Sequence, residues 1–220
     1  MGQEQLIGRG AFLSFEGIDG SGKSTQARLL AAALRGAGAT VTLTREPGGS
    51  PGAEDIRRLV LEGDADRWSP QTELLLFTAA RRDHLEKTIR PAVARGEVVI
   101  SDRFADSTRI YQGLTRGDLR DTVDRLHDLV IGCEPDLTVL IDIDPSLGLS
   151  RAVARASDAP SGRHAYLFAG VASALWIGGV ASWAAYEFGA GGAELDPLRI
   201  AIYALIALAP IGMQVVPVRR

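Results

Sequence analysis

Residues 17–24 have the types and spacing of a phosphate-binding loop. They read Gly-Ile-Asp-Gly-Ser-Gly-Lys-Ser, the pattern GxxxxGKS, directly after an apolar run at 12–16. Glycines let backbone N–H groups converge on phosphate oxygens, and a helix starting near Lys23 adds the partial positive charge of its N-terminus. In this pattern Lys23 reaches the β- and γ-phosphates of a nucleoside triphosphate, and the Ser24 hydroxyl ligates Mg²⁺. The alternative is a tight glycine turn between a strand and a helix. The residues expected to surround the phosphates are Gly17, Ile18, Asp19, Gly20, Ser21, Gly22, Lys23, Ser24 and Thr25.

A second group of charged residues follows another apolar run. Asp102 and Arg103 end the run at 98–101. Beside a phosphate loop, a carboxylate at Asp102 can hold the water shell of a metal, and the guanidinium of Arg103 can face a second anion through its bidentate fork. The alternative is a surface ion pair. We therefore expect Asp102 and Ser24 at the metal and Arg103 at a second phosphate.

Two further segments carry weaker signals. Phe77 and Arg81 are four residues apart and share one face of an expected helix, where they can stack a base and hydrogen-bond its edge. The alternative is a core aromatic residue and a solvated arginine. Residues 44–49 form a polar turn after the run at 41–44, at the edge of the sheet that would carry ligands.

The pattern along the chain predicts the elements that position these residues. Four short apolar runs, at 12–16, 41–44, 98–101 and 137–143, indicate strands. Helical periodicity lies between them, in a segment ending near Gly36 and in segments 70–90 and 118–131. This alternation predicts an α/β fold in three layers, a parallel sheet with flanking helices.

Composition limits the classes of function. The 220 residues are 46% hydrophobic and 23% charged, which is typical of a globular protein. Twenty-four basic and 27 acidic residues give a net charge of −3, so no global positive field favours nucleic acid as a partner. A single cysteine, Cys133, excludes an internal disulfide and is expected to pack in the interior. His84, His127 and His164 lack partners at metal-ligand spacing.

The chain changes character near residue 156. Residues 165–186 and 200–218 are uncharged over 22 and 19 residues, and as helices would extend roughly 33 and 28 Å, close to the hydrocarbon core of a bilayer at about 30 Å. Arginines precede the first run and follow the second, which favours cytoplasmic ends. We interpret 1–155 as one domain, 156–164 as a linker, and 165–220 as an apolar helical pair, either a transmembrane hairpin or two buried helices.

Four motifs together resemble the bacterial thymidylate kinases. They are SFEGIDGSGKSTQ at 14–26, TREPGG at 44–49, LLLFTAARRDH at 74–84 and SDRFADSTRIYQG at 101–113, in the order and spacing of that family over about residues 12–155. The resemblance implies phosphorylation of dTMP to dTDP with ATP and Mg²⁺, in the cytoplasm, by a homodimer.

The resemblance also implies individual roles. Phe77 is similar to the ring that stacks on thymine, Arg81 to the donor to the base carbonyl, and Arg103 to the clamp on the dTMP phosphate. Four further positions match residues that bind dTMP: Arg45 near the phosphate, Thr108 at the base edge, Tyr111 where an aromatic ring crowds a ribose 2′-hydroxyl, and Asp19 near the sugar and the metal.

The match does not extend to the tail. The phosphate loop has no arginine, and relatives of this kind supply the transition-state cation from an arginine-bearing lid, of which SRAVAR at 150–155 resembles the beginning, with Arg155 as the candidate. The rest of the lid and the fifth strand are expected to be absent. Lys23, Arg103 and Arg155 are thus the expected catalytic residues. Two alternatives stay open, namely a catalytically deficient nucleotide-binding module attached to a membrane hairpin, and a kinase for another nucleoside monophosphate. If residues 165–218 form a hairpin in the bilayer, they would also tether a thymidylate kinase to the cytoplasmic face of the inner membrane.

Overall fold

The computed structural model describes residues 10–64, 66–115, 117–157 and 213–216, of which 155–157 and 213–216 are described by their backbone alone. The strands are β1 (Ala11–Glu16), β2 (Val41–Arg45), β3 (Val98–Asp102), β4 (Leu137–Ile141) and β5 (Met213–Val216). The α-helices are α1 (Lys23–Gly36), α2 (Pro51–Leu61), α3 (Pro70–His84), α4 (Arg90–Ala94), α5 (Ala105–Ile110), α6 (Arg120–Leu126) and α7 (Pro145–Ser157). Three π-helical turns, η2 (Leu85–Ile89), η3 (Tyr111–Thr115) and η4 (His127–Ile131), continue α3, α5 and α6.

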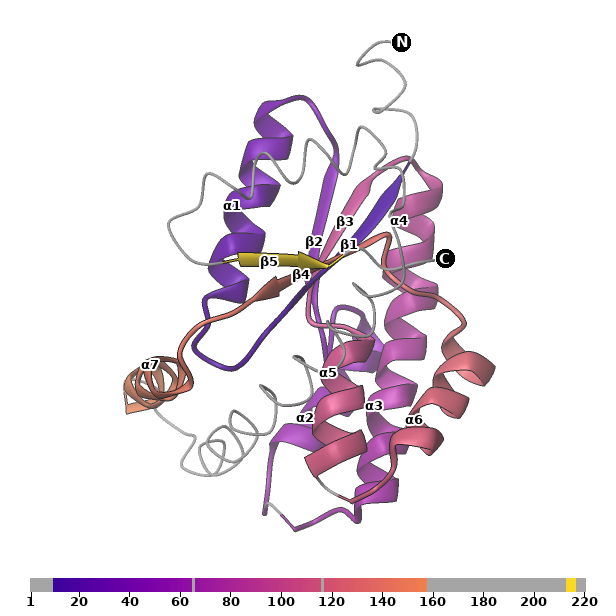
Figure 1. Ribbon diagram of the computed structural model, residues 1–220. Helices are drawn as coiled ribbons and strands as arrows, with labels where there is room; N and C mark the ends of the chain where they lie inside the picture. Colours follow the sequence, from indigo (N-terminus) through magenta and orange to yellow (C-terminus); the bar gives the residue numbers. More distant parts are fainter. Residues whose placement is uncertain (1–9, 65, 116, 158–212, 217–220) are drawn as a thin grey trace, which may run out of the picture.

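The sheet confirms the four predicted strands. Its order is β2-β3-β1-β4-β5, and the first four strands run parallel (Figure 1). The order brings β1 and β3 together although about eighty residues separate them, with Phe15 opposite Asp102. The N–H of Arg103 donates to the carbonyl of Phe15 over 2.9 Å, one residue beyond the last pair. The loop after β1 and the residues after β3 therefore begin side by side.

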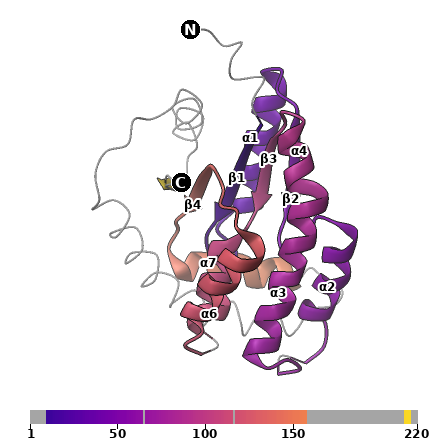
Figure 2. The same cartoon turned by 90° about the vertical axis from the view of Figure 1, so that its right-hand side faces the viewer.

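Helices cover both faces of the sheet (Figures 1 and 2). Alternate side chains of β1 point to opposite faces, as the pleat of a strand requires. Leu13 and Phe15 are buried against Ala27 and Leu30 of α1 on one face. Phe12 packs on the other face, in a cluster with residues of η2, α4 and η4 and with Phe104. Cys133 packs against this second cluster, as predicted.

The edge strand β5 corrects two expectations for the tail. Residues 213–216 pair antiparallel to β4, with Thr138 opposite Val216 and Ile141 opposite Met213. The helix predicted over 200–218 therefore does not hold at these four positions, and a fifth strand is present. Pairing there satisfies backbone groups along the outer edge of β4, and valine favours an extended strand.

The other expectations for the tail lie mostly outside the described residues. These are the linker from residue 158 onwards, the first apolar run at 165–186 and the second run up to residue 212. Within the segments that the structure describes, every helix is too short or too polar to cross a bilayer.

Candidate functional site

The loop between β1 and α1 has the backbone conformation that phosphate binding needs. Gly17, Gly20 and Gly22 have φ angles of 143°, 84° and 99°. Helix α1 begins at Lys23 with no side-chain cap and no acidic residue in its first turn. The turn thus has no carboxylate of its own to compete for its N–H groups, and the helix dipole favours an anion there.

Lys23 lies inside this loop. Its side chain is 6% exposed, and its Nζ donates to the carbonyl of Ile18 over 2.7 Å. Burial and the nearby guanidinium of Arg103 lower the pKa of Lys23 to about 7. Phosphate oxygens beside the ammonium group would stabilise its charged form, because an opposite charge offsets the cost of burial.

Ser24 and Asp102 meet at the start of α1. The Ser24 hydroxyl donates a short hydrogen bond to the Asp102 carboxylate, so the first turn of α1 is linked to the end of β3. A hydroxyl and a carboxylate are oxygen donors of the kind Mg²⁺ prefers. Among the described residues, no group of three or more His, Cys, Asp or Glu could hold a metal ion. The Ser24–Asp102 pair offers two oxygen ligands to a cation at the phosphate loop.

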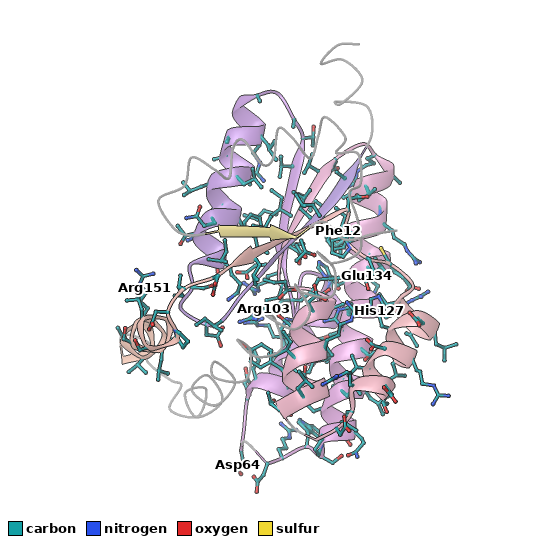
Figure 3. All side chains as sticks on the ribbon, in the orientation of Figure 1. Phe12, Asp64, Arg103, His127, Glu134 and Arg151 are labelled. Carbon is teal, nitrogen blue, oxygen red and sulfur yellow. The ribbon has the colours of Figure 1, made fainter. Side chains whose placement is uncertain are left out.

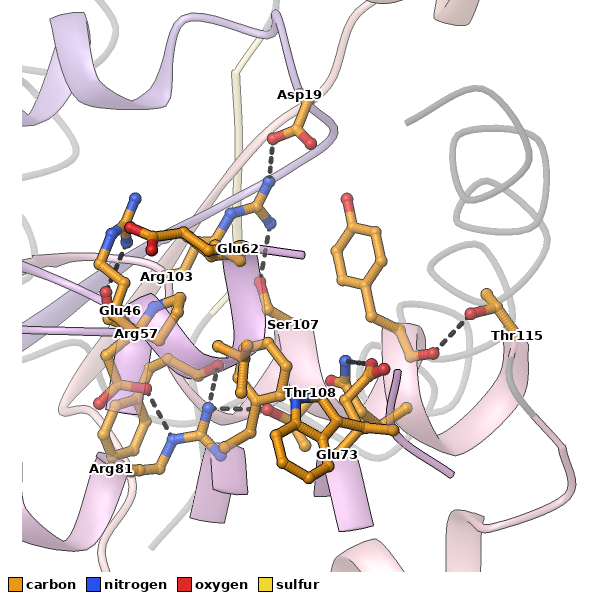
Figure 4. Close-up of a pocket in the computed structure, with 18 of the residues that line it drawn as sticks. Asp19, Glu46, Arg57, Glu62, Glu73, Arg81, Arg103, Ser107, Thr108 and Thr115 are labelled. Carbon is orange, nitrogen blue, oxygen red and sulfur yellow. Dashed lines mark hydrogen bonds and ion pairs between the residues drawn. The ribbon is translucent and has the colours of Figure 1, made fainter. Parts of the chain in front are cut away.

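Arg103 lies between the phosphate loop and a cavity beyond it (Figures 3 and 4). Its guanidinium pairs with Asp19 of the loop and donates to Ser107 Oγ over 2.9 Å. The same group lies over the ring of Tyr111, 5.3 Å from its centroid. The backbone of Arg103 has a φ of 77°, which is uncommon for a residue other than glycine. The expected anion clamp therefore stands at the boundary of the two halves of the site.

The cavity has a volume of about 400 Å³ and is wide enough for a mononucleotide. Its walls come from the phosphate loop, the turn after β2, helices α2 and α3, and the segment from Arg103 to Thr115. Six of the predicted binding residues line it: Asp19, Phe77, Arg81, Arg103, Thr108 and Tyr111.

Arg81 is held rigidly at the wall of this cavity. It is 5% exposed, so the alternative of a solvated arginine is wrong. Its Nε donates to Glu46 over 2.7 Å, and its Nη2 donates to Thr108 Oγ1 over 2.8 Å (Figure 4). Its Nη1 makes no hydrogen bond to the residues that the structure describes, which leaves two N–H groups for a ligand.

Glu46 is the buried partner that holds Arg81. Although burial raises the pKa of Glu46, Arg81 and His84 lower it more, so the pKa lies below its ordinary value. His84 is fully buried and lies between Glu46 and Thr44, 3.0 Å from Glu46 Oε1 and 2.7 Å from Thr44 Oγ1. His84 is therefore a core histidine held by two polar partners.

Arg45 is the predicted dTMP-binding residue that the structure does not bring to the cavity. It ends β2, and its side chain is 57% exposed and pairs with Glu54 of α2 at 3.2 Å. Thr25 accepts a hydrogen bond from Arg28 within α1. Arg155 lies in the last turn of α7, and its side chain is outside the described residues.

Several site residues are not evident from the sequence. Arg57 of α2 lines the cavity and donates to the carbonyl of Pro47. Trp68 and Gln112 also line it.

Glu16 is a further residue that the sequence analysis did not single out. It ends β1, is 1% exposed, and accepts hydrogen bonds from the N–H of Phe104 and from Ser107. The one signal in the sequence for Glu16 was a carboxylate at the end of an apolar strand, because a buried carboxylate needs polar partners.

Gly20 and Gly22 test the loop as a matched pair. A Cβ on Gly20 would lie 1.9 Å from the carbonyl oxygen of Gly148, whereas a Cβ on Gly22 would have open space. Gly22→Ala should lower the free energy of unfolding by about 1–2 kcal/mol, because its backbone is left-handed. Gly20→Ala must in addition displace the loop or α7, so the affinity of this variant for ATP should be about ten-fold lower than that of Gly22→Ala. Titration calorimetry measures this difference, and equal affinities in the two variants would contradict it.

Glu16 predicts a dependence of stability on pH. Burial and the nearby Asp106 raise the pKa of Glu16 to about 7. The folded state then holds its proton more tightly than the unfolded state, so stability falls as the pH rises through 7. Between about pH 5 and about pH 8, the free energy of unfolding of the natural protein should fall by about 2 kcal/mol more than that of Glu16→Gln, because the glutamine cannot ionise. Urea denaturation at several pH values measures this, and parallel curves would exclude it.

Comparison with known proteins agrees with this geometry. The family model described as thymidylate kinase matches residues 15–167, past residue 155 where the resemblance was expected to end. The thymidylate kinase of Ruegeria pomeroyi is 76% identical over 150 residues, 68% of this chain and 71% of that protein. That of Dinoroseobacter shibae is 72% identical over 148 residues, 67% of this chain and 72% of that protein.

A solved structure gives the same result in three dimensions. The crystal structure of thymidylate kinase from Ehrlichia chaffeensis has a TM-score of 0.58 and 42% identity to this chain, covering 68% of this chain and 86% of its own. The family model spans more than half of the chain and includes the phosphate loop and every residue that lines the cavity. The chain belongs to the thymidylate kinase family.

Proposed function

We propose that this chain transfers the γ-phosphoryl group of ATP to dTMP, giving ADP and dTDP. The observation that carries the proposal is the position of Arg103, whose guanidinium is paired to the phosphate loop through Asp19 and also lines the neighbouring cavity. Relatives at 72–76% identity are thymidylate kinases, which supports dTMP as the acceptor.

The loop is the site for the donor. Its N–H groups, the N-terminus of α1 and Lys23 would hold the β- and γ-phosphates of ATP. Mg²⁺ held by Ser24 and Asp102 would neutralise charge on these phosphates and orient them. Ser24 and Asp102 are already joined to one another, so the two oxygen donors are held in place before a ligand arrives.

The cavity is the site for the acceptor. Phe77 would stack on the thymine ring, and the free Nη1 of Arg81 would donate to a carbonyl at the base edge, beside Thr108. Tyr111 would lie against the sugar, where its ring leaves little room for a 2′-hydroxyl. Arg103 would then hold the phosphate of dTMP at the end of the cavity that faces Lys23.

No general base is needed for this transfer. The phosphate of dTMP carries anionic oxygens at neutral pH, so an oxygen of the acceptor attacks the γ-phosphorus of ATP in line, while the bond to the β-γ bridging oxygen breaks and ADP leaves. The residues contribute alignment and charge neutralisation. Lys23 stabilises the donor side, and Arg103 stabilises the acceptor side.

A further cation would stabilise the transition state, and we assign it to Arg155. The phosphate loop supplies no arginine of its own. Helix α7 passes close to the loop, since a Cβ on Gly148 would lie 3.1 Å from the carbonyl oxygen of Asp19. Arg155 lies two turns further along the same helix. Arginines in this role raise the rate of phosphoryl transfer by about 10³ to 10⁵.

We place this reaction in the cytoplasm, where ATP is available. Attachment of residues 165–186 to a membrane, and a homodimer, remain predictions. Membrane fractionation with and without detergent tests the first, and sedimentation of the full chain tests the second.

Turnover is the direct test of the proposed function. The full chain with ATP, Mg²⁺ and dTMP should release ADP and dTDP, whereas Lys23→Ala should lose at least about 10² in kcat, because the loop loses its only lysine. Leu129→Ala, at an 83% exposed position, serves as the control and should keep full activity. A coupled assay for ADP with chromatography of dTDP measures both. Equal rates in the natural protein and Lys23→Ala would reject the proposal, and saturable dTMP binding without turnover would instead identify a catalytically deficient module.

Tyr111 tests the identity of the acceptor. In the natural protein, competition among dTMP, dUMP, UMP and CMP should favour dTMP. Tyr111→Ala removes the ring beside Arg103, so the preference for dUMP over UMP should narrow about ten-fold, since a buried hydroxyl without room or partner costs about 1–3 kcal/mol. Tyr111→Phe keeps the ring and should keep the preference. A chain that prefers UMP or CMP from the outset would be a kinase for another nucleotide.

A further inference from the structure

Arg103 is held in a backbone conformation that its own side chain does not favour. Within the described segments it is the one residue other than glycine with a positive φ, at 77°. Such a conformation is strained for a residue other than glycine and persists only where the surroundings impose it. The N–H of Arg103 donates to Phe15, and its carbonyl accepts from Ser101 Oγ over 2.7 Å. These two bonds fix the residue itself but leave the direction of the following chain undetermined.

Glu16 supplies two of the bonds that fix that direction, and Arg81 supplies a third, since its Nη2 donates to the carbonyl of Phe104 over 3.0 Å. The Oε1 of Glu16 accepts from the N–H of Phe104 over 2.7 Å, directly after Arg103. Its Oε2 accepts from the Ser107 hydroxyl over 2.6 Å. Ser107 Oγ in turn accepts from Arg103 Nη1 over 2.9 Å. One carboxylate therefore holds the backbone after Arg103 with one oxygen and the tip of its guanidinium, through Ser107, with the other.

Glu16 acts from behind the cavity rather than within it. Its side chain is 1% exposed and is not part of the wall, whereas Arg103 and Ser107 both line the cavity. A ligand in the cavity cannot touch Glu16, so any effect of Glu16 on that ligand must pass through the segment from Arg103 to Ser107. The carboxyl group of Glu16 also interacts electrostatically with Arg103 and with Asp106.

We infer that Glu16 is a positioning residue for the acceptor phosphate: through the Phe104 N–H and the Ser107 hydroxyl it sets the direction in which Arg103 presents its guanidinium to that phosphate. The inference rests on the proposed function, because it takes the phosphate of dTMP as the ligand of Arg103. It separates two parts of acceptor binding. Glu16 governs the grip on the phosphate, whereas Phe77 and Arg81 hold the base from α3. Arg81 and Glu16 both bond to Phe104, but Arg81 is also held by Glu46 and Thr108, which are independent of Glu16.

Comparing dTMP with thymidine tests this separation. The two ligands share the base and the sugar, and thymidine lacks the phosphate. In Glu16→Gln, the amide can still accept from Phe104 but places an NH₂ group opposite Ser107. Titration calorimetry should show the Kd for dTMP raised about ten-fold, with the Kd for thymidine changed less than about two-fold. In kinetics, kcat/KM for dTMP should fall by a similar factor while the KM for ATP stays constant.

Ser107→Ala provides a second route to the same result. It removes the link from Glu16 to the guanidinium and leaves the bond from Glu16 to Phe104, so the decision does not depend on whether Glu16→Gln folds. Glu97→Gln is the matched control for the carboxylate, since Glu97 is hydrogen-bonded to Thr42 at the opposite end of the sheet. Ser14→Ala is the control for the serine, since Ser14 is buried on β1 and bonded to Thr138.

The outcomes distinguish the two proposals. Unchanged dTMP affinity in Glu16→Gln and Ser107→Ala, or equal weakening of dTMP and thymidine, would overturn the role of Glu16 while leaving the proposed function in place. Failure of the natural protein itself to bind dTMP would overturn the proposed function, and the role of Glu16 with it. Loss of affinity for dTMP alone, in both variants and in neither control, supports the inference.

Discussion

Two phosphate-bearing molecules repel one another, and a site that joins them must place fixed cations where they meet. In this chain the donor side holds a buried lysine, Lys23, in a glycine loop, and the acceptor side holds Arg103. Arg103 pairs with Asp19 of the loop while its guanidinium also lines the cavity. Both cations are fixed before any ligand arrives, which lowers the reorganisation that binding requires. The other elements of the site can be understood as the means of keeping these two groups in place.

The sheet positions the segments that carry these two groups. Because β1 and β3 are adjacent and parallel, the residues that follow them begin at the same edge, and Phe15 lies opposite Asp102. The phosphate loop and the Asp102–Arg103 pair are therefore brought together by strand register rather than by flexible loops. Hydrogen bonds then complete the arrangement. Ser24 joins α1 to Asp102, and Glu46 joins Arg81 to His84. These bonds satisfy buried polar groups, as the low polarity of the interior demands, whereas Ser21 Oγ of the phosphate loop is buried without a hydrogen-bond partner among the described residues.

The sequence predicted the local elements better than the contacts between them. The glycine loop, the four parallel strands and the helices at 70–90 and 118–131 follow from periodicity and turn chemistry, and they are confirmed. The cavity residues Phe77 and Arg81 were found through helix spacing and family resemblance. Glu16 and Arg57 were missed because their roles depend on partners about ninety and ten residues away, Ser107 and Pro47, which periodicity does not reveal.

Two other differences concern Arg45 and the tail. The position of Arg45 was not predicted, because its side chain pairs with Glu54 on a helix that the pattern did not predict. The strand at 213–216 was missed because an apolar run does not distinguish a helix from an edge strand.

The central claim is that Arg103 holds the acceptor phosphate in line with the donor at Lys23. A crystal structure of the full chain with dTMP and a non-hydrolysable ATP analogue tests it most directly. The account predicts the dTMP phosphate within hydrogen-bonding distance of the Arg103 guanidinium, the thymine ring stacked on Phe77, and the γ-phosphate beside Lys23. A dTMP phosphate bound away from Arg103, or a thymine ring outside the cavity lined by Phe77, would contradict it.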